Sequence, residues 1–244
     1  MHRFFVNLDN IDESTIEFGA EVVSHIRSLR LRPDEQFIIS DGNCNDYICK
    51  LVPNSGDDKS VAEIIAKQKC HSEPSIKCIN YIAYSKGDRL DYAVQKSVEL
   101  GVHEIVLFES ARCVAVPNNI PKKIERLQRI SFETAKQSGR GIIPKISAIG
   151  NFKSAIKAVK ESSALPLFFY ESEEDINLMT VLNQESNIAN VAIITGPEGG
   201  FEPHEVEYAN ESGIHPISLG PRILRCETAP IVALSAVMYH TGNL

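Results

Sequence analysis

The sequence has no long hydrophobic run. A membrane-spanning helix needs about eighteen consecutive apolar residues, and no such stretch occurs in the chain. Near the N-terminus, Asp9 interrupts the chain before an apolar segment long enough for a secretory signal can form. We therefore expect a cytoplasmic protein that has no membrane partner.

The sequence also lacks the cysteine and histidine spacing of a metal site. Its six cysteines contain no C-x-x-C pair, and no histidine stands at the spacing that a zinc site requires. Such cysteines are expected to stay reduced in a cytoplasmic protein. The sequence thus predicts no metal ion.

Common motifs for nucleotide binding and hydrolysis are absent as well. The chain has no G-x-G-x-x-G dinucleotide fingerprint, no phosphate-binding loop with Gly-Lys-Ser/Thr and no G-x-S-x-G elbow. The histidines are scattered and have no repeating partner acid. We therefore expect neither a dinucleotide fold of the usual kind nor a serine hydrolase.

The composition is that of an ordinary globular protein. The 244 residues are 43% hydrophobic and 23% charged, and this length suffices for two modest domains or one large one. The net charge of −7 argues against a protein that coats nucleic acid indiscriminately. A local basic site remains compatible with this charge.

One segment carries a local excess of positive charge. Residues 122–145 contain two acids, Glu125 and Glu133, against seven basic residues. Phosphate contacts supply most of the non-specific affinity for RNA, so this segment is a candidate RNA-binding face. A solvated helix face is an equally good interpretation. The basic residues are Lys122, Lys123, Arg126, Arg129, Lys136, Arg140 and Lys145.

The N-terminal part, up to about residue 69, is expected to be rich in β-strands. Apolar residues at helical spacing predict one helix over residues 13–30. Strands are expected over residues 36–40 and 47–52, on either side of the turn signal Asp41-Gly42. Basic residues near the helix end are a second candidate RNA contact, or simply cations that favour a helix C-terminus. They are His25, Arg27, Arg30 and Arg32.

From residue 76 onward, apolar strands alternate with amphipathic helices. Alternation of this kind predicts an α/β domain with a parallel sheet covered by helices. The expected pattern of strands and helices changes near residues 70–74, so we place a boundary there and expect domains of residues 1–72 and 73–244. The expected strands are residues 79–84, 104–108, 145–149, 165–170, 191–195 and 217–219.

A glycine-rich segment, Thr195-Gly196-Pro197-Glu198-Gly199-Gly200-Phe201, follows one of these strands. Pro203 and early acids then predict the start of a helix. Ligands bind at such strand ends in α/β sheets, where a helix start offers free N–H donors. A tight connector without any ligand is the alternative.

A second segment, residues 219–229, joins a short strand to an almost wholly apolar helix. Arg222 and Arg225 flank Ile223 and Leu224 just before this helix. A helix that is apolar all round must be buried, so these guanidinium groups are expected beside a packed wall. The alternative is a pair of solvated arginines followed by Thr228 as a helix cap.

Together the two segments closely resemble the knotted, SPOUT-class methyltransferases, and within them the ribosomal RNA small-subunit methyltransferase E family. The resemblance covers nearly the whole chain. Cys226, where the family usually has threonine, and Ala111, where it usually has an acid, depart from the pattern. Further matches are Arg3-Phe4-Phe5-Val6, Lys86-Gly87-Asp88-Arg89-Leu90-Asp91, Gln95-Lys96, Glu99-Leu100-Gly101-Val102 and Gln137-Ser138-Gly139-Arg140.

The resemblance implies a fold and an activity. The fold would be a PUA-like β-barrel over residues 1–72, followed by a SPOUT domain over residues 73–244 with a deep trefoil knot. The activity would be S-adenosylmethionine-dependent methylation of N3 of a uridine in the decoding region of 16S ribosomal RNA. It also implies a homodimer. Alternatives are a non-catalytic RNA-binding factor of ribosome assembly and a related enzyme that acts on transfer RNA.

The resemblance also implies site residues. Arg225 is the first candidate to stabilise negative charge on the uridine, with Arg222 or Arg140 second. Glu198 and Glu227 are the acids that could accept a proton, unless they hold a loop and cap a helix; water could also accept it. The expected cofactor contacts are Phe169, Tyr170, Glu171, Thr195, Gly196, Pro197, Glu198, Gly199, Gly200, Leu219, Gly220, Pro221, Arg222, Ile223, Leu224, Thr228 and Ala229, and the expected RNA contacts are Arg3, Arg27, Arg30, Arg112, Arg126, Arg129 and Arg140.

Overall fold

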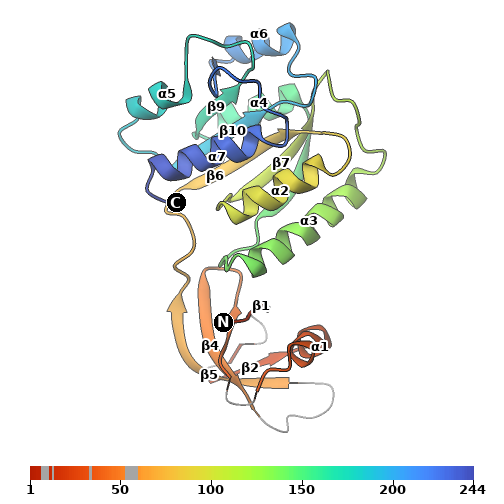
Figure 1. The fold of residues 1–244 in the computed structure, drawn as a ribbon, viewed down its shortest axis with the longest axis vertical. Helices are drawn as coiled ribbons and strands as arrows, with labels where there is room; N and C mark the ends of the chain where they lie inside the picture. Colours follow the sequence, from red (N-terminus) through yellow and green to blue (C-terminus); the bar gives the residue numbers. More distant parts are fainter. Residues whose placement is uncertain (7–10, 13, 33–34, 53–59) are drawn as a thin grey trace. The chain divides into compact units, whose positions relative to one another are not determined.

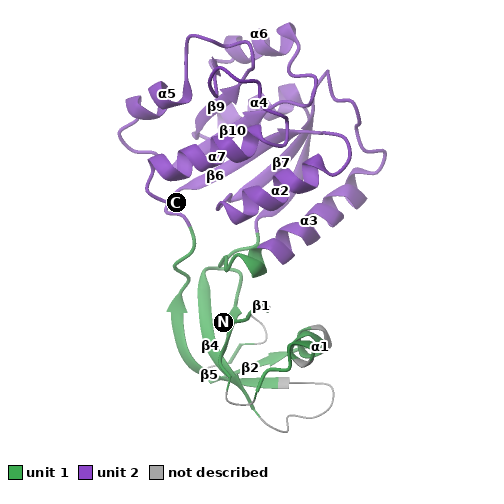
Figure 2. Ribbon diagram, viewed as in Figure 1, with its two compact units in different colours: residues 1–73, 135–143 green, residues 74–134, 144–244 purple. Residues whose placement is uncertain are grey.

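The computed structural model describes residues 1–6, 11–12, 14–32, 35–52 and 60–244, without the side chains of residues 20, 21, 27 and 60. It divides into two compact units, residues 1–73 with 135–143 and residues 74–134 with 144–244 (Figures 1 and 2). The first cut lies beside the expected boundary. The sequence pattern does not predict that residues 135–143 belong to the first unit.

The first unit is built on a five-stranded sheet. Its strand order is β1-β3-β4-β5-β2, with β1 parallel to β3 and the other neighbours antiparallel. Phe4, Phe18 and Phe37 pack edge to face in the core between the sheet and helix α1. Among the described strands the sheet is an open half-barrel, and its full closure stays a prediction. The elements are β1 (Arg3–Phe5), β2 (Thr15–Phe18), α1 (Ala20–Leu29), β3 (Phe37–Ser40), β4 (Asn45–Leu51) and β5 (Ser60–Lys69).

One helix expected in this unit begins later than predicted. Residues 13–30 carry apolar side chains at helical spacing, but β2 occupies Thr15–Phe18 and α1 starts only at Ala20. The reason is pairing with β5, which buries Ile16 and Phe18 in the core. Tertiary contacts thus override the local periodicity at the start of the segment.

The second unit contains a six-stranded sheet in which every pairing is parallel. The strand order is β11-β9-β10-β6-β7-β8. The central strand β10 is buried along nearly its whole length, as its run of β-branched residues predicts. The predicted parallel sheet is confirmed. The strands are β6 (Lys77–Ala83), β7 (Glu104–Glu109), β8 (Lys145–Asn151), β9 (Leu165–Phe169), β10 (Asn190–Thr195) and β11 (Pro216–Ile217).

Helices cover both faces of this sheet (Figure 1). The apolar helix α7 packs against β6, β10 and helix α2, while α4 and α6 contact each other on the opposite face. No helix in the described ranges is long and apolar enough to cross a membrane. The helices are α2 (Arg89–Glu99), α3 (Ile120–Gln137), α4 (Phe152–Glu161), α5 (Leu178–Gln184), α6 (Pro203–Glu211) and α7 (Ala229–His240).

The order of the strands creates a switch point between β6 and β10. From β6 the chain continues to β7 and β8 on one side, whereas from β10 it continues to β11 on the other side. The loops that leave these two neighbouring strands therefore diverge at their carboxyl ends. In α/β sheets, ligands bind in the crevice at such a point.

Candidate functional site

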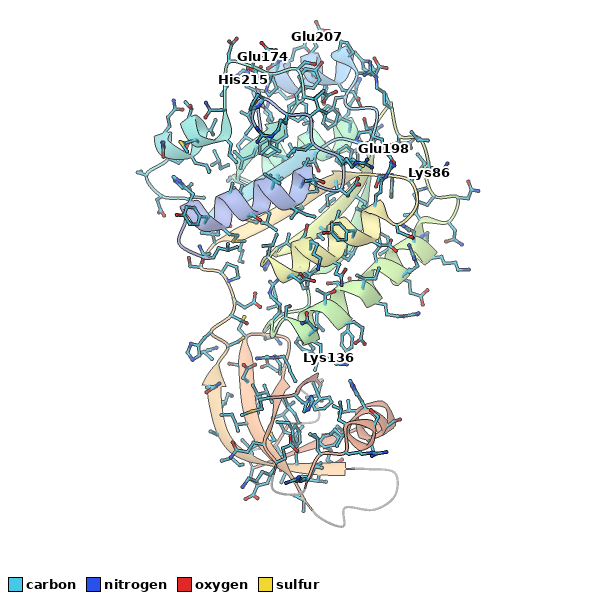
Figure 3. The ribbon with its side chains drawn as sticks, viewed as in Figure 1. Lys86, Lys136, Glu174, Glu198, Glu207 and His215 are labelled. Atoms are coloured by element: carbon cyan, nitrogen blue, oxygen red, sulfur yellow. The ribbon has the colours of Figure 1, made fainter. Side chains whose placement is uncertain are left out.

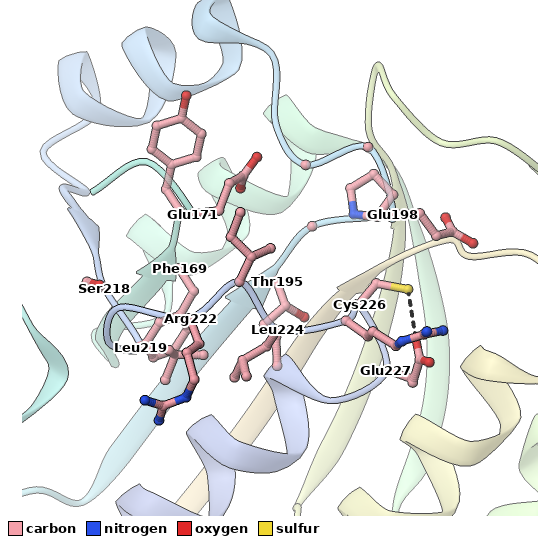
Figure 4. A pocket seen from close by; sticks show the side chains of 18 of the residues that line it. Phe169, Glu171, Thr195, Glu198, Ser218, Leu219, Arg222, Leu224, Cys226 and Glu227 are labelled. Atoms are coloured by element: carbon pink, nitrogen blue, oxygen red, sulfur yellow. Dashed lines mark hydrogen bonds between the residues drawn. The ribbon is translucent and has the colours of Figure 1, made fainter. Parts of the chain in front are cut away.

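A pocket of about 510 Å³ lies at this end of the sheet (Figure 4). The ends of β9 and β10 and the segment between β11 and α7 form most of its wall. Of the predicted cofactor contacts, only Pro221 and Thr228 do not line it. The lining residues are Arg89, Phe169, Tyr170, Glu171, Thr195, Gly196, Pro197, Glu198, Gly199, Gly200, Ser218, Leu219, Gly220, Arg222, Ile223, Leu224, Arg225, Cys226, Glu227 and Ala229.

The loop after β10 needs its glycines for space and for backbone conformation. A Cβ atom on Gly196 would lie 3.0 Å from the Phe201 ring, which is itself buried against Phe168 with ring centroids 4.9 Å apart. Gly200 has φ +68°, and a Cβ atom there would lie 1.9 Å from Oε1 of Glu171. At Gly196 the buried Phe201 ring leaves little room for a side chain, and at Gly200 the positive φ disfavours any other residue.

Two N–H groups at the start of α6, those of Glu202 and Glu205, are already engaged in a capping box and are not free donors as the sequence predicts. The Glu202 backbone N–H donates to Oε2 of Glu205 at 3.0 Å. The buried Glu205 carboxylate also accepts hydrogen bonds from Oγ of Ser110 at 3.0 Å and from the backbone N–H of Ala111 at 3.1 Å. These donors are engaged because Glu205, the third residue of the helix, forms a reciprocal capping box with Glu202.

Arg112 braces the same loop from outside. Its Nε donates to Oε1 of Glu202 at 2.8 Å, and its Nη1 donates to the carbonyl oxygen of Gly199 at 3.1 Å. The hydrogen bond from Arg112 lowers the pKa of the Glu202 carboxyl. Arg112 was predicted to contact RNA, but its guanidinium here holds the pocket loop in place.

On the pocket wall, Arg89 links two acids that come from different segments, Glu198 and Glu227, both labelled in Figure 4. Its Nη1 donates to Oε1 of Glu198 at 2.9 Å, and its Nε lies 3.9 Å from Oε2 of Glu227. The same Glu198 oxygen accepts the backbone N–H of Lys86 at 2.7 Å. Glu198 therefore ties the loop after β6 to the loop after β10.

These contacts decide how Glu198 and Cys226 are protonated. Burial alone would raise the pKa of Glu198, but hydrogen bonds from the Lys86 N–H, from its own backbone and from Arg89 outweigh burial and lower it. Burial, together with a hydrogen bond to Glu227, raises the pKa of the Cys226 thiol to about 11. Glu198 is thus a poor proton acceptor, and the geometry favours its structural alternative.

Two buried polar atoms on the pocket wall have no hydrogen-bond partner in the described part of the chain. They are Oγ1 of Thr195, whose residue is 1% exposed, and Oε2 of Glu198. A buried polar group that makes no hydrogen bond costs about 1–3 kcal/mol, so such groups are rare unless something else satisfies them. Both residues belong to the pocket wall.

The two arginines before α7 are exposed at the pocket. Neither guanidinium of Arg222 or Arg225 has an acceptor among the residues that the structure describes. Ile223 between them is 84% exposed, whereas Leu224 is only partly exposed. Both arginines can therefore contact a ligand or substrate at the exposed opening of the pocket. The sequence predicts that they lie beside a packed wall, and the structure instead exposes them to solvent.

Two predicted RNA contacts are corrected by their burial. The Arg3 side chain is 9% exposed and forms a two-pronged ion pair with Asp46, at 2.6 and 2.7 Å. Arg140 is 2% exposed and pairs in the same way with Glu73, at 2.8 and 2.7 Å. Buried charges of this kind are retained only with a partner, so both arginines serve the fold of the first unit.

The other predicted RNA contacts are mostly at the surface. Arg126 is half-exposed and pairs with Asp91, and Arg129 is 73% exposed beside Glu125. Arg30 is exposed at the end of α1, and the side chain of Arg27 lies outside the described residues. These arginines do not form one site with the pocket residues in the described contacts.

Five pocket residues were not predicted as cofactor contacts, and one of them, Arg225, was predicted as a catalytic residue instead. Glu227 and Cys226 belong to the motif that carries the family resemblance, and Ser218 lies within a predicted strand, so their positions carried a signal. Arg89 had a weaker one, because nothing in its neighbourhood links it to Glu198, 109 residues further along the chain. The predicted contacts other than Pro221 and Thr228 line one pocket, and their binding of a cofactor stays a prediction.

A glycine-lined pocket at the switch point of a parallel sheet is typical of α/β proteins that bind nucleotide-like ligands. A family model for an RNA methyltransferase domain matches residues 72–238. The ribosomal RNA small subunit methyltransferase E of Mesomycoplasma hyopneumoniae is 36% identical over 96% of this chain and 98% of its own length. The protein of that name from Bacillus subtilis is 32% identical over 100% and 98%.

A solved structure agrees with these relatives. The ribosomal RNA small subunit methyltransferase E of Neisseria gonorrhoeae, bound to S-adenosyl methionine, has a TM-score of 0.83 at 29% identity and covers 98% of this chain and 97% of its own. The chain therefore belongs to the ribosomal RNA small subunit methyltransferase E family. The predictions of a methyltransferase and of S-adenosylmethionine as its cofactor are confirmed by these relatives.

Proposed function

We propose that this protein transfers a methyl group from S-adenosylmethionine to N3 of one uridine in the decoding region of 16S ribosomal RNA. The pocket at the switch point is the observation that carries this proposal. It combines a glycine-rich wall, apolar surface and two exposed arginines with a buried hydroxyl that has no hydrogen-bond partner among the described residues. The relatives named for small-subunit ribosomal RNA support the choice of substrate.

The pocket residues fit such a cofactor. Apolar surface for an adenosine ring comes from Phe169, Leu219 and Leu224, and Thr195 offers a hydroxyl that can donate or accept. Backbone groups of the loop at residues 196–200 can approach closely because the glycines there carry no side chain. Bound there, S-adenosylmethionine supplies an activated methyl group.

Uridine N3 must lose its proton before it can act as a nucleophile. The new bond then forms between N3 and the methyl carbon while the bond from that carbon to sulfur breaks, and water takes the N3 proton. Negative charge that develops on O2 and O4 of the base needs a fixed cation. Arg225 is our first candidate and Arg222 our second, because neither guanidinium is engaged by a described acceptor.

Glu198 is better suited to holding the pocket than to accepting the proton. Its carboxylate is ionised, accepts hydrogen bonds from Lys86 and Arg89, and would lose them on protonation. Arg140, an earlier alternative for charge stabilisation, is buried in the first unit with Glu73. Catalysis would then depend on how the pocket positions uridine N3 against the methyl carbon, and on Arg222 and Arg225.

We further propose that exposed arginines of α1 and α3 contact RNA phosphates, and that residues 1–72 form a PUA-like RNA-binding domain. Arg30, Arg126 and Arg129 are the described candidates, since salt-dependent phosphate contacts require exposed cations.

The C-terminal segment would form the trefoil knot of the SPOUT class behind the loop of residues 196–200. The protein would act in the cytoplasm, where such a substrate is found.

We also propose a homodimer. The apolar helix α7 leaves Val232 and Tyr239 exposed, at 38% and 77%, although one side of the helix is buried against the sheet. A second copy of the chain would cover this face.

Transfer of radioactive methyl groups tests the proposed substrate against its alternatives. Small ribosomal subunits that lack the modification, the naked 16S RNA and bulk transfer RNA are each incubated with the protein and labelled S-adenosylmethionine. We expect label in the ribosomal RNA and none in transfer RNA, with loss of transfer in Arg225→Ala. Label in transfer RNA alone would favour the related enzyme, and RNA binding without transfer would favour the assembly factor.

A further inference from the structure

We propose that the cluster of Arg89, Glu198 and Glu227 makes the pocket select the positively charged cofactor over its neutral product. The inference rests on the proposed function, since it takes S-adenosylmethionine as the ligand. It assigns a specificity role to three side chains on the pocket wall, of which Glu198 and Glu227 are labelled in Figure 4.

The cluster contains two carboxylates and one guanidinium. Arg89 lies 2.9 Å from Glu198 and 3.9 Å from Glu227, so a single cation is shared between two acids. Oε2 of Glu198 is buried and makes no hydrogen bond within the described residues. Cys226 donates its thiol proton to Oε2 of Glu227 at 3.2 Å and so adds no charge of its own. The cluster therefore carries a net charge of about −1.

The other charges on the pocket wall do not cancel this field. They are Arg222, Arg225 and Glu171, all exposed, so water and salt screen them. The side chains of Glu198 and Glu227 are each only 17% exposed. Charges in this partly buried setting act more strongly on a ligand than charges on the surface. The effective sign of the pocket is thus set by the cluster.

The cofactor and its product differ by one charge. S-adenosylmethionine carries a sulfonium group, while S-adenosylhomocysteine has a neutral thioether; both keep the same amino and carboxyl groups. A net negative pocket consequently stabilises the cofactor more than the product. For one unit charge about 8 Å away at an effective dielectric of about 40, the preference is on the order of fivefold.

Calorimetric titration of the whole protein with three ligands tests this selection. The ligands are S-adenosylmethionine, S-adenosylhomocysteine and sinefungin, an analogue that carries an amine cation in place of the sulfonium group. Glu227→Gln removes one negative charge, and we expect the ratio of product Kd to cofactor Kd to fall about fivefold. Arg89→Gln removes the shared cation, and the same ratio should rise. Sinefungin should follow the cofactor in both variants.

Two controls separate charge from structure. Glu207→Gln removes an exposed acid on α6, away from Glu198 (Figure 3), and should leave the ratio unchanged. Thermal melting checks that each variant is folded, and Glu198→Gln replaces Glu227→Gln if that variant does not fold. A merely structural role would weaken all three ligands in parallel.

The outcomes are distinguishable. Opposite changes in the ratio for Glu227→Gln and Arg89→Gln support charge selection. Parallel losses, or a ratio that stays constant in folded variants, overturn this inference while the proposed function stands. If the folded wild type binds none of the three ligands, with or without RNA, the result contradicts both the proposed function and this inference.

Discussion

The buried ion pair of Arg140 with Glu73 separates a structural role for this arginine from the predicted contact with RNA. Its guanidinium makes two hydrogen bonds to Glu73, and that carboxylate also accepts the backbone N–H of Gly141 at 2.7 Å. Arg140→Met removes the cation but keeps an unbranched chain of similar length. It leaves the Glu73 carboxylate, whose side chain is 13% exposed, without its charge partner.

The expected loss of stability is large. Breaking a buried ion pair by removing one partner typically costs about 3–5 kcal/mol. For a unit of this size, each kcal/mol corresponds to roughly 4–8 °C in melting temperature, so the first unit should melt at least about 10 °C lower. The matched control is Arg129→Met, which removes an exposed pair with Glu125 and should change stability by less than about 1 kcal/mol.

Differential scanning calorimetry resolves the melting of the first unit in both variants. A titration with a fragment of 16S RNA at two salt concentrations measures RNA affinity in parallel. If Arg140→Met melted within about 2 °C of the wild type and lost RNA affinity with a smaller salt slope, Arg140 would be an RNA contact and our structural assignment would be refuted.

Four further predictions follow from single contacts. Burial would raise the pKa of Glu73, but Arg140 and two backbone N–H groups outweigh burial and lower it. The ionised Glu73 therefore stabilises the fold above its ordinary pKa of 4.5, and this stabilisation is lost as the pH falls through the lower pKa of the folded state. Melting curves recorded at decreasing pH should show the loss, and Arg140→Met should reduce this pH dependence. Gly200→Ala should weaken S-adenosylmethionine binding about tenfold by calorimetry, whereas Gly213→Ala, with φ +82° and open space around it, should not. Thr195→Val should weaken the same binding several-fold without lowering the melting temperature, because Oγ1 has no described partner to lose. Alkylation of Cys226 at pH 8 should be at least about tenfold slower than that of a free peptide thiol, measured by mass spectrometry, since its pKa is raised to about 11; equal rates would contradict the thiol's environment.

The sequence predicts those parts of the molecule whose signals are local. The run of β-branched residues in β10 specifies a buried strand, and the glycines at residues 196–200 specify a loop that no side chain may crowd. Both features lie on a few consecutive residues. The parallel sheet and most of the pocket wall could therefore be anticipated.

Contacts between distant residues could not be anticipated. Arg3 and Arg140 are basic residues in an acidic chain, but their partners Asp46 and Glu73 lie 43 and 67 residues away. Nothing near either arginine in sequence distinguishes a buried ion pair from a phosphate contact.

The Arg89 cluster was hidden for the same reason, because Glu198 reaches it only through the pairing of β6 with β10. Within the segment 13–30, residues Thr15–Phe18 likewise form a strand only because β5 lies beside them.

The central claim is that the pocket directs a methyl group to N3 of a uridine in 16S ribosomal RNA. Its most direct test is mass spectrometry of nucleosides released from small subunits, lacking the modification, after incubation with the protein and S-adenosylmethionine. We predict one 3-methyluridine per 16S RNA, within a decoding-region fragment, and none with Arg225→Ala. A methyl group on ribose, on another base or outside that fragment would contradict the account.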